Sequence, residues 1–86
     1  MTSRTTLRVL KFLLENKDNW SWGSQISKET KVKIGTTFYI LRRYFEDGWL
    51  QDRWEGEDRD RSIPRPPRRL YRLTKLGISL VKKEVD

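Results

Sequence analysis

The chain has 86 residues, with 19 Lys and Arg against 12 Asp and Glu, which gives a net charge of +7. This length allows one domain with a modest core and argues against a second independent core. An aromatic content of 12%, with four Trp, offsets the low apolar fraction of 35% and argues against disorder throughout the chain.

The residue types that the chain lacks exclude several classes of function. It contains no Cys and no His, which excludes disulfide scaffolds, thiolate metal sites and histidine-based proton transfer. It shows no apolar run long enough to cross a bilayer and no signal peptide at its start. We therefore expect a cytoplasmic protein that is not an enzyme, with no metal site and no cofactor. The positive charge favours a polyanionic partner.

The first predicted element is a helix over about residues 3–16. Thr2 or Ser3 can cap it, because a side-chain oxygen accepts a hydrogen bond from an unpaired amide of the first turn. Its apolar residues recur at the spacing of a half-buried helix. They are Leu7, Val9, Leu10, Leu13 and Leu14.

Two further helices are predicted, the first over about residues 23–30 with Ile26 facing inward. Residues 31–33 form the turn that leads to a third helix over about residues 35–47, which Gly48 ends in a left-handed conformation. Plotted at 100° per residue, one arc of this helix faces the core. Its residues are Thr37, Ile40, Leu41 and Tyr44, with Phe38 and Phe45 on the flank.

The second half of the chain changes to an extended pattern, first over residues 49–54 and again over residues 68–73. Between them, residues 55–67 hold all three prolines, so they form neither a helix nor a central strand. Thr74 can cap a last helix over about residues 75–83. The inward residues of that helix are Leu76, Leu80 and Val81.

This order of elements predicts a mainly α (α+β) fold, the winged helix-turn-helix, with three helices, a two-stranded β-wing and a short C-terminal helix. The arc of the third helix opposite the core is polar, with arginines near its middle. An exposed helix of this width fits the DNA major groove, where Arg can bind guanine through two hydrogen bonds and Thr can contact a thymine methyl. Amides of its first turn also attract phosphate.

The candidate DNA-binding residues in and before this helix are Lys33, Thr36, Thr37, Tyr39, Arg42 and Arg43. The alternative is that Arg42 and Arg43 only solvate an exposed face. Their position on the third helix of a helix-turn-helix favours DNA contact. Tyr39 can either bind a phosphate or lean over the end of the second helix.

The predicted wing loop is divided by charge, with acidic residues at its start and a basic return limb. The candidate DNA-binding residues of that limb are Arg61, Arg65, Arg68 and Arg69. A basic run of this kind favours a phosphate backbone because condensed counterions are released. Residues 55–62 can instead be a self-neutralising disordered loop, whereas Arg65, Arg68 and Arg69 have few acids close by and are the better candidates. Residues 64–67 also fit a Pro-x-x-Pro ligand, although a wing explains the prolines without a second partner.

Residues 35–50 read Gly-Thr-Thr-Phe-Tyr-Ile-Leu-Arg-Arg-Tyr-Phe-Glu-Asp-Gly-Trp-Leu. This stretch resembles the recognition helix and first wing strand of PadR-like transcriptional regulators. Residues 67–77 read Pro-Arg-Arg-Leu-Tyr-Arg-Leu-Thr-Lys-Leu-Gly. This stretch is similar to the return strand of the wing in that family. Residues 22–26 show a weaker match to its His-Gly-Tyr-Glu-Ile segment. Together the three matches lie within about residues 7–80.

The resemblance implies a role for several residues of this chain. Thr36 stands at the start of the recognition helix, Arg43 matches the family's arginine, and Arg68 and Arg69 match the base of its wing. Phe38 stands where the family usually has Tyr, so any contact through that hydroxyl is lost. The family generally continues into further helices that form a dimer, which this chain lacks, and its wing is shorter. The oligomeric state and any effector pocket therefore stay open.

We expect residues 1–86 to be one winged-helix domain of a sequence-specific double-stranded DNA-binding transcriptional regulator. The third helix would enter the major groove, and the wing would contact the adjacent backbone or minor groove. A homodimer is the better expectation for such a regulator. The alternatives are a protein-interaction module, with Trp20 and Trp22 as anchors, and an architectural factor that bends DNA in recombination.

Overall fold

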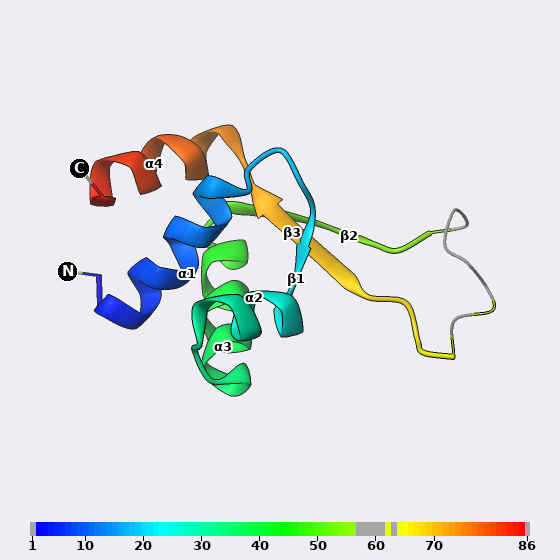
Figure 1. Cartoon of the computed structure of the whole chain (residues 1–86). Coiled ribbons are helices and arrows are strands. Elements are labelled where there is room, and N and C mark those ends of the chain that lie inside the picture. Colours follow the sequence, from blue (N-terminus) through cyan, green and yellow to red (C-terminus); the bar gives the residue numbers. More distant parts are fainter. Residues whose placement is uncertain (1, 57–61, 63, 86) are drawn as a thin grey trace.

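The computed structural model describes residues 2–56, 62 and 64–85, and within them the predicted winged helix-turn-helix is confirmed (Figure 1). The elements in chain order are α1 (Arg4–Glu15), β1 (Ser21–Trp22), α2 (Gly23–Thr30), α3 (Ile34–Glu46), β2 (Leu50–Trp54), β3 (Arg69–Leu73) and α4 (Lys75–Val85). Figure 1 shows the helices gathered at one end and the β2–β3 ribbon projecting away from them, with α3 and α4 on opposite sides.

The first helix begins as predicted, because Ser3 Oγ accepts a hydrogen bond from the Thr6 amide at 3.1 Å. The residues that α1 buries are Val9, Leu10 and Leu13. Leu7 and Leu14 of the predicted apolar stripe are only half-buried, so the buried face of the helix is narrower than predicted. This buried stripe packs against α2, α3 and α4.

In the described part of the chain, the sheet has three strands rather than the predicted two. The two-residue strand β1 pairs with β3, which lies between β1 and β2, and both pairings are antiparallel. Ser21 lies opposite Tyr71, and Leu50 lies opposite Leu73. The prediction missed β1 because two residues cannot show an alternating pattern, and because their partners follow about 50 residues later in the chain.

One contiguous core joins the helices to the inner face of the sheet. Its buried apolar residues are Val9, Leu10, Leu13, Ile26, Val32, Ile40, Leu41, Tyr44, Leu50, Tyr71, Leu73 and Val81. The predicted inner arc of α3 is confirmed by this set, and Thr37 completes the arc as a buried polar residue. The core therefore fixes which face of α3 is left for solvent.

The junction between the ribbon and α4 is also close to prediction. Gly48 has a φ of +81°, as expected of the left-handed residue that ends α3. Thr74 Oγ1 accepts a hydrogen bond from the Gly77 amide at 3.0 Å, which confirms the predicted cap. The prediction that Leu76 faces inward is wrong, since 53% of this residue is exposed. None of the helices in the described part of the chain is both long and apolar enough to span a bilayer.

A close backbone approach at Gly77 predicts a specific stability defect. A Cβ at this position would collide with the Trp49 carbonyl group, whereas a Cβ at Gly35 would meet nothing within 4 Å. We expect Gly77→Ala to lower the free energy of unfolding by roughly 1–3 kcal/mol, the usual cost of overpacking. The matched control Gly35→Ala should leave it unchanged or raise it by up to about 1 kcal/mol, because Ala is the better helix former. Urea unfolding of both variants measures the difference, and equal stabilities would contradict the prediction.

Candidate nucleic-acid interface

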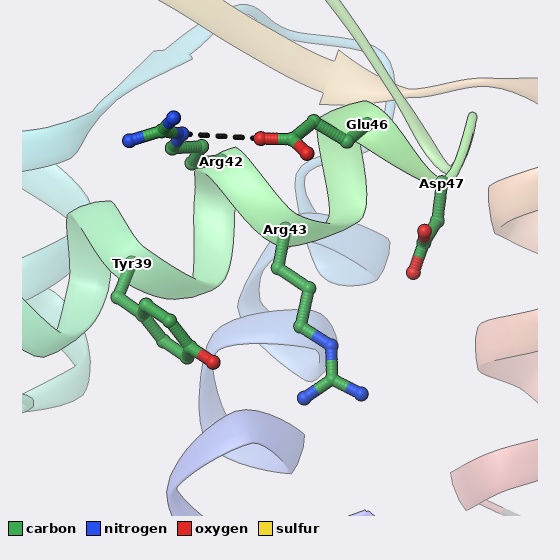
Figure 2. A pocket seen from close by; sticks show the side chains of 5 residues that line it. All are labelled: Tyr39, Arg42, Arg43, Glu46 and Asp47. Atoms are coloured by element: carbon green, nitrogen blue, oxygen red, sulfur yellow. Dashed lines mark hydrogen bonds and ion pairs between the residues drawn. The ribbon is translucent and has the colours of Figure 1, made fainter.

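The solvent-facing arc of α3 carries the residues that the sequence placed there. Thr36, Tyr39, Arg42, Arg43 and Glu46 are all exposed or half-exposed. Figure 2 shows Arg42 and Glu46 on one side of the helix, with Tyr39 and Arg43 extending from the other side. The arc therefore has one edge beside the ribbon and a second edge turned away from it.

Arg42 is presented to solvent with most of its hydrogen-bonding capacity free. Its Nε donates to Glu46 Oε1 at 3.1 Å, and 83% of its side chain is exposed. An exposed ion pair of this kind, four residues apart on a helix, contributes only a few tenths of a kcal/mol. Within the described residues, no protein acceptor binds its two Nη atoms. Those atoms can therefore form the paired hydrogen bonds that guanine accepts.

Arg43 and the start of α3 are also accessible. Among the described residues, the contact recorded for the Arg43 guanidinium is with the Tyr44 ring, 5.9 Å from its centroid. Lys33 and Thr36 are exposed at the beginning of the helix, and among the described residues no side chain caps its first turn. Unpaired amides therefore lie beside a cationic side chain and a hydroxyl, a combination suited to phosphate.

Thr37 is a correction to the predicted site. It is fully buried, and its hydroxyl lies within hydrogen-bond distance of the Lys33 carbonyl at 3.1 Å and of the Val32 carbonyl at 3.3 Å. Its side chain therefore ties α3 to the turn after α2 and is not available to DNA. The burial of Thr37 agrees with its predicted place on the core-facing arc, so naming it as a DNA-binding residue as well was the error.

Arg65 is held by an acid of its own chain. Its Nη1 and Nη2 donate to the two carboxylate oxygens of Glu55 at 2.7 and 3.3 Å, and the Arg68 amide donates to the same carboxylate at 2.8 Å. The pKa of the Glu55 carboxyl falls from its usual 4.5 to about 2, chiefly through the Arg65 hydrogen bond and next through the Arg68 amide. The expectation that Arg65 has few acids nearby is wrong, because the hairpin brings Glu55 back to it.

Arg69 is also bound by an acid of its own chain, so the expectation that it has few acids close by is wrong as well. Its Nε donates to Asp52 Oδ2 at 2.8 Å, and its guanidinium lies 5.0 Å from the Phe45 ring centroid and 5.3 Å from that of Tyr71. Asp52 is opposite Tyr71 in the antiparallel register, which places it diagonally across from Arg69 on one face of the sheet. These contacts fix the guanidinium beside α3.

The outer face of the sheet holds a second set of arginines on tryptophan rings. The Arg68 guanidinium lies 4.3 Å from the Trp22 centroid, and Arg72 lies 4.3 Å from that of Trp20. Arg53 lies 5.7 Å from the same Trp20 ring. Both tryptophans are half-buried. The sequence did not indicate this role for the two tryptophans, since it depends on the pairing of β1 with β3.

The structure therefore divides the predicted wing residues. A groove of about 480 Å³ runs between α3 and the ribbon, and its lining residues are Phe38, Arg42, Phe45, Glu46, Arg69 and Tyr71. Arg69 thus shares a surface with Arg42, whereas Arg68 lies on the outer face and Arg65 binds Glu55. Arg61 lies outside the described residues. Within those residues, no group of three or more acidic side chains is placed to hold a metal ion.

No protein-family model and no curated protein matches the chain. Among solved structures, it is similar to a transcriptional regulator homologue from Pyrococcus horikoshii OT3, at 22% identity and a TM-score of 0.72, over 93% of this chain and 71% of that one. It is similar to a PadR family transcription regulator from Clostridium difficile, at 17% identity and a TM-score of 0.76, over 96% of this chain and 84% of that one. A mutant of MarR from E. coli matches at 17% identity and a TM-score of 0.74, over 95% of this chain and 54% of that one. These likenesses show that the chain has the winged-helix fold found in such regulators.

The contact between Glu55 and Arg65 predicts an acidic titration. Because the pKa of Glu55 is lowered to about 2, the contribution of its charged form to stability is complete above about pH 4.5 and is lost as the pH falls toward 2. We expect the Glu55 carboxyl resonance to titrate near pH 2 by NMR, and Arg65→Met to move that midpoint toward 4.5. Arg42→Met, which removes an arginine from α3, is the control and should leave it unchanged. A midpoint near 4.5 in the unaltered chain would exclude the contact.

Proposed function

We propose that this protein is a sequence-specific transcriptional regulator that binds double-stranded DNA in the manner of PadR-like winged-helix proteins. The exposed arc of α3 enters the major groove, and the ribbon follows the adjacent backbone or minor groove. The observation that carries the proposal is that Arg42 and Arg43 are both exposed, one at each edge of the solvent-facing arc of the third helix, in a winged-helix fold with a net charge of +7.

The two arginines are suited to different edges of a DNA site. Arg42 lies beside the ribbon, and its free Nη atoms favour direct binding to a guanine edge. Arg43 extends from the opposite edge of the arc, near Tyr39, where either a base or a phosphate can be reached. The accessible helix start, with Lys33 and Thr36, would hold a phosphate and set the orientation of α3.

The wing contributes less free charge than its arginine content indicates. Arg65 and Arg69 already bind carboxylates, so a phosphate must compete with Glu55 and Asp52 for them. The same contacts hold both guanidiniums in place, which lowers the entropy lost when DNA binds. The ribbon therefore mainly orients the protein on the duplex, and the cations of α3 supply most of the affinity for DNA.

In this function residues 1–86 act as a single non-enzymatic domain that needs no cofactor. A homodimer would place two α3 helices on an inverted repeat. Trp20 and Trp22 are occupied by arginines of the sheet, which weakens their role as anchors for a protein partner. Protein interaction is the alternative that the binding experiments separate from DNA binding. Architectural DNA bending is the second alternative, which differs mainly in requiring tandem sites.

Removal of one recognition arginine should weaken specific binding far more than random binding. On a duplex selected from a random pool, we expect Arg42→Ala to cost about 1–3 kcal/mol of binding free energy and to relax the base preference. Lys82→Ala removes the same charge from the exposed surface of α4, away from α3, and is the matched control. Equal losses on selected and random duplexes would contradict base reading. Failure to bind any duplex at physiological salt, with a stoichiometric protein partner in a pull-down, would favour an interaction module.

Lys33 should behave as a phosphate contact. We expect Lys33→Ala to weaken binding to all duplexes alike and to make the slope of log K against log salt shallower by about 0.9, the value for one phosphate. Fluorescence anisotropy over a series of salt concentrations measures this slope. Lys82→Ala should leave it unchanged, and a sequence-dependent loss for Lys33→Ala would assign this residue to base reading instead.

A further inference from the structure

We propose that Phe38 reads DNA sequence by packing its ring against the 5-methyl group of a thymine. This inference rests on the proposed DNA-binding function and deepens it. It assigns to α3 an apolar base contact beside the arginine contacts, at a position where the side chain has no polar group. The helical periodicity predicts Phe38 on the flank of the core-facing arc.

The first observation is that a large apolar ring is left in solvent at the centre of the candidate interface. Phe38 is 49% exposed, and it lies one helical turn before Arg42 on the edge of α3 that faces the ribbon. Its neighbour on the same flank, Phe45, is partly covered by packing against the core and the Arg69 guanidinium. Phe38 therefore presents apolar surface that the fold itself does not cover.

The second observation is that the distal edge of the ring packs against α2. A Cβ built on Gly23, the first residue of α2, would lie 2.5 Å from both Cε1 and Cζ of Phe38, so the ring would have to shift to admit it. The distal edge of the ring therefore rests against the α2 backbone at Gly23. A ring supported on one edge loses less conformational entropy on binding than a fully free one.

The third observation is the chemistry of the groove around the ring. Phe38 shares this groove with two aromatic rings, with the Glu46 carboxylate and with two arginines, Arg42 on α3 and Arg69 on β3. Each arginine donates its Nε to a carboxylate, and Arg42 keeps its Nη atoms for the phosphates and guanine atoms of a duplex. This arrangement matches a major groove better than it matches an apolar protein partner.

The thymine methyl is the occupant that this surface selects. In the major groove, the 5-methyl group of thymine is the apolar feature among hydrogen-bonding base edges. Phe38 has no hydroxyl, so it cannot bind a phosphate or a base edge through a hydrogen bond. Arg42 follows it by four residues, about 6 Å along the helix axis or roughly two base-pair steps of about 3.4 Å. We therefore expect the thymine to lie within about two base pairs of a guanine.

Replacement of thymine by deoxyuridine tests this directly, because it removes the methyl group and nothing else. A duplex site is selected with the full chain from a random pool, and each thymine is then replaced in turn. We expect one replacement near a guanine to weaken binding by the unaltered protein about threefold to fivefold, the value of one buried methyl group. Phe38→Ala should bind the thymine and deoxyuridine duplexes equally, and Phe38→Leu should keep part of the difference.

Leu76→Ala is the matched control, since Leu76 is a comparably exposed apolar residue, 53% exposed, on α4. It should keep the full preference for thymine, and thermal unfolding confirms that each variant is folded. If every deoxyuridine site binds as well as its thymine counterpart, or if Phe38→Ala keeps the preference, Phe38 only packs on Gly23 and the inference fails while DNA binding stands. If no duplex is enriched by the unaltered chain, the proposed function fails and this inference fails with it.

Discussion

The position of β3 between β1 and β2 is the constraint on which the rest of the structure depends. Side chains alternate along a strand, so this one pairing directs Arg69, Tyr71 and Leu73 to the helices and Leu70 and Arg72 to the outer face. A slip of one residue would exchange the two sets. Arg69 would then leave the groove beside α3, and the buried tyrosine and leucine would lose the core. Burial of Tyr71 and Leu73 therefore keeps Arg69 on the face of the sheet that lies beside α3.

Electrostatics in this molecule combine excess positive charge with local neutralisation. Asp52 on β2 binds Arg69 at the start of β3. Glu55, just after β2, binds Arg65, which precedes β3. Such half-exposed pairs contribute little to stability, but they give each guanidinium a defined place. Arg42 and Arg43 lie on the solvent-facing arc of α3, and the guanidiniums of Arg68 and Arg72 lie on tryptophan rings. Arg42 of α3 is thus far more accessible than Arg65 and Arg69 of the wing, whose charges are compensated by carboxylates.

The sequence predicted well those features that depend on local chemistry. Helical periodicity located all four helices, and the caps at Ser3 and Thr74 and the left-handed Gly48 are where residue preferences place them. Features that depend on distant partners were missed. The strand β1 is too short to show a pattern, and the acids that bind Arg65 and Arg69 reach them only through the hairpin. Charge spacing along the chain therefore overstated how free the wing arginines are.

The candidate site divides in the same way between what is local and what is not. The exposed arc of α3 follows from its own periodicity, so Arg42 and Arg43 could be placed from sequence alone. The role of Phe38 could not, because it requires the backbone of Gly23 behind the ring and Arg69 across the groove. A helix with the ribbon fixed at one edge cannot roll freely in a major groove. In the proposed complex, the residues along that edge, Phe38 and Arg42, would therefore meet bases in a register that the sheet sets, which is why an apolar contact there would carry sequence information.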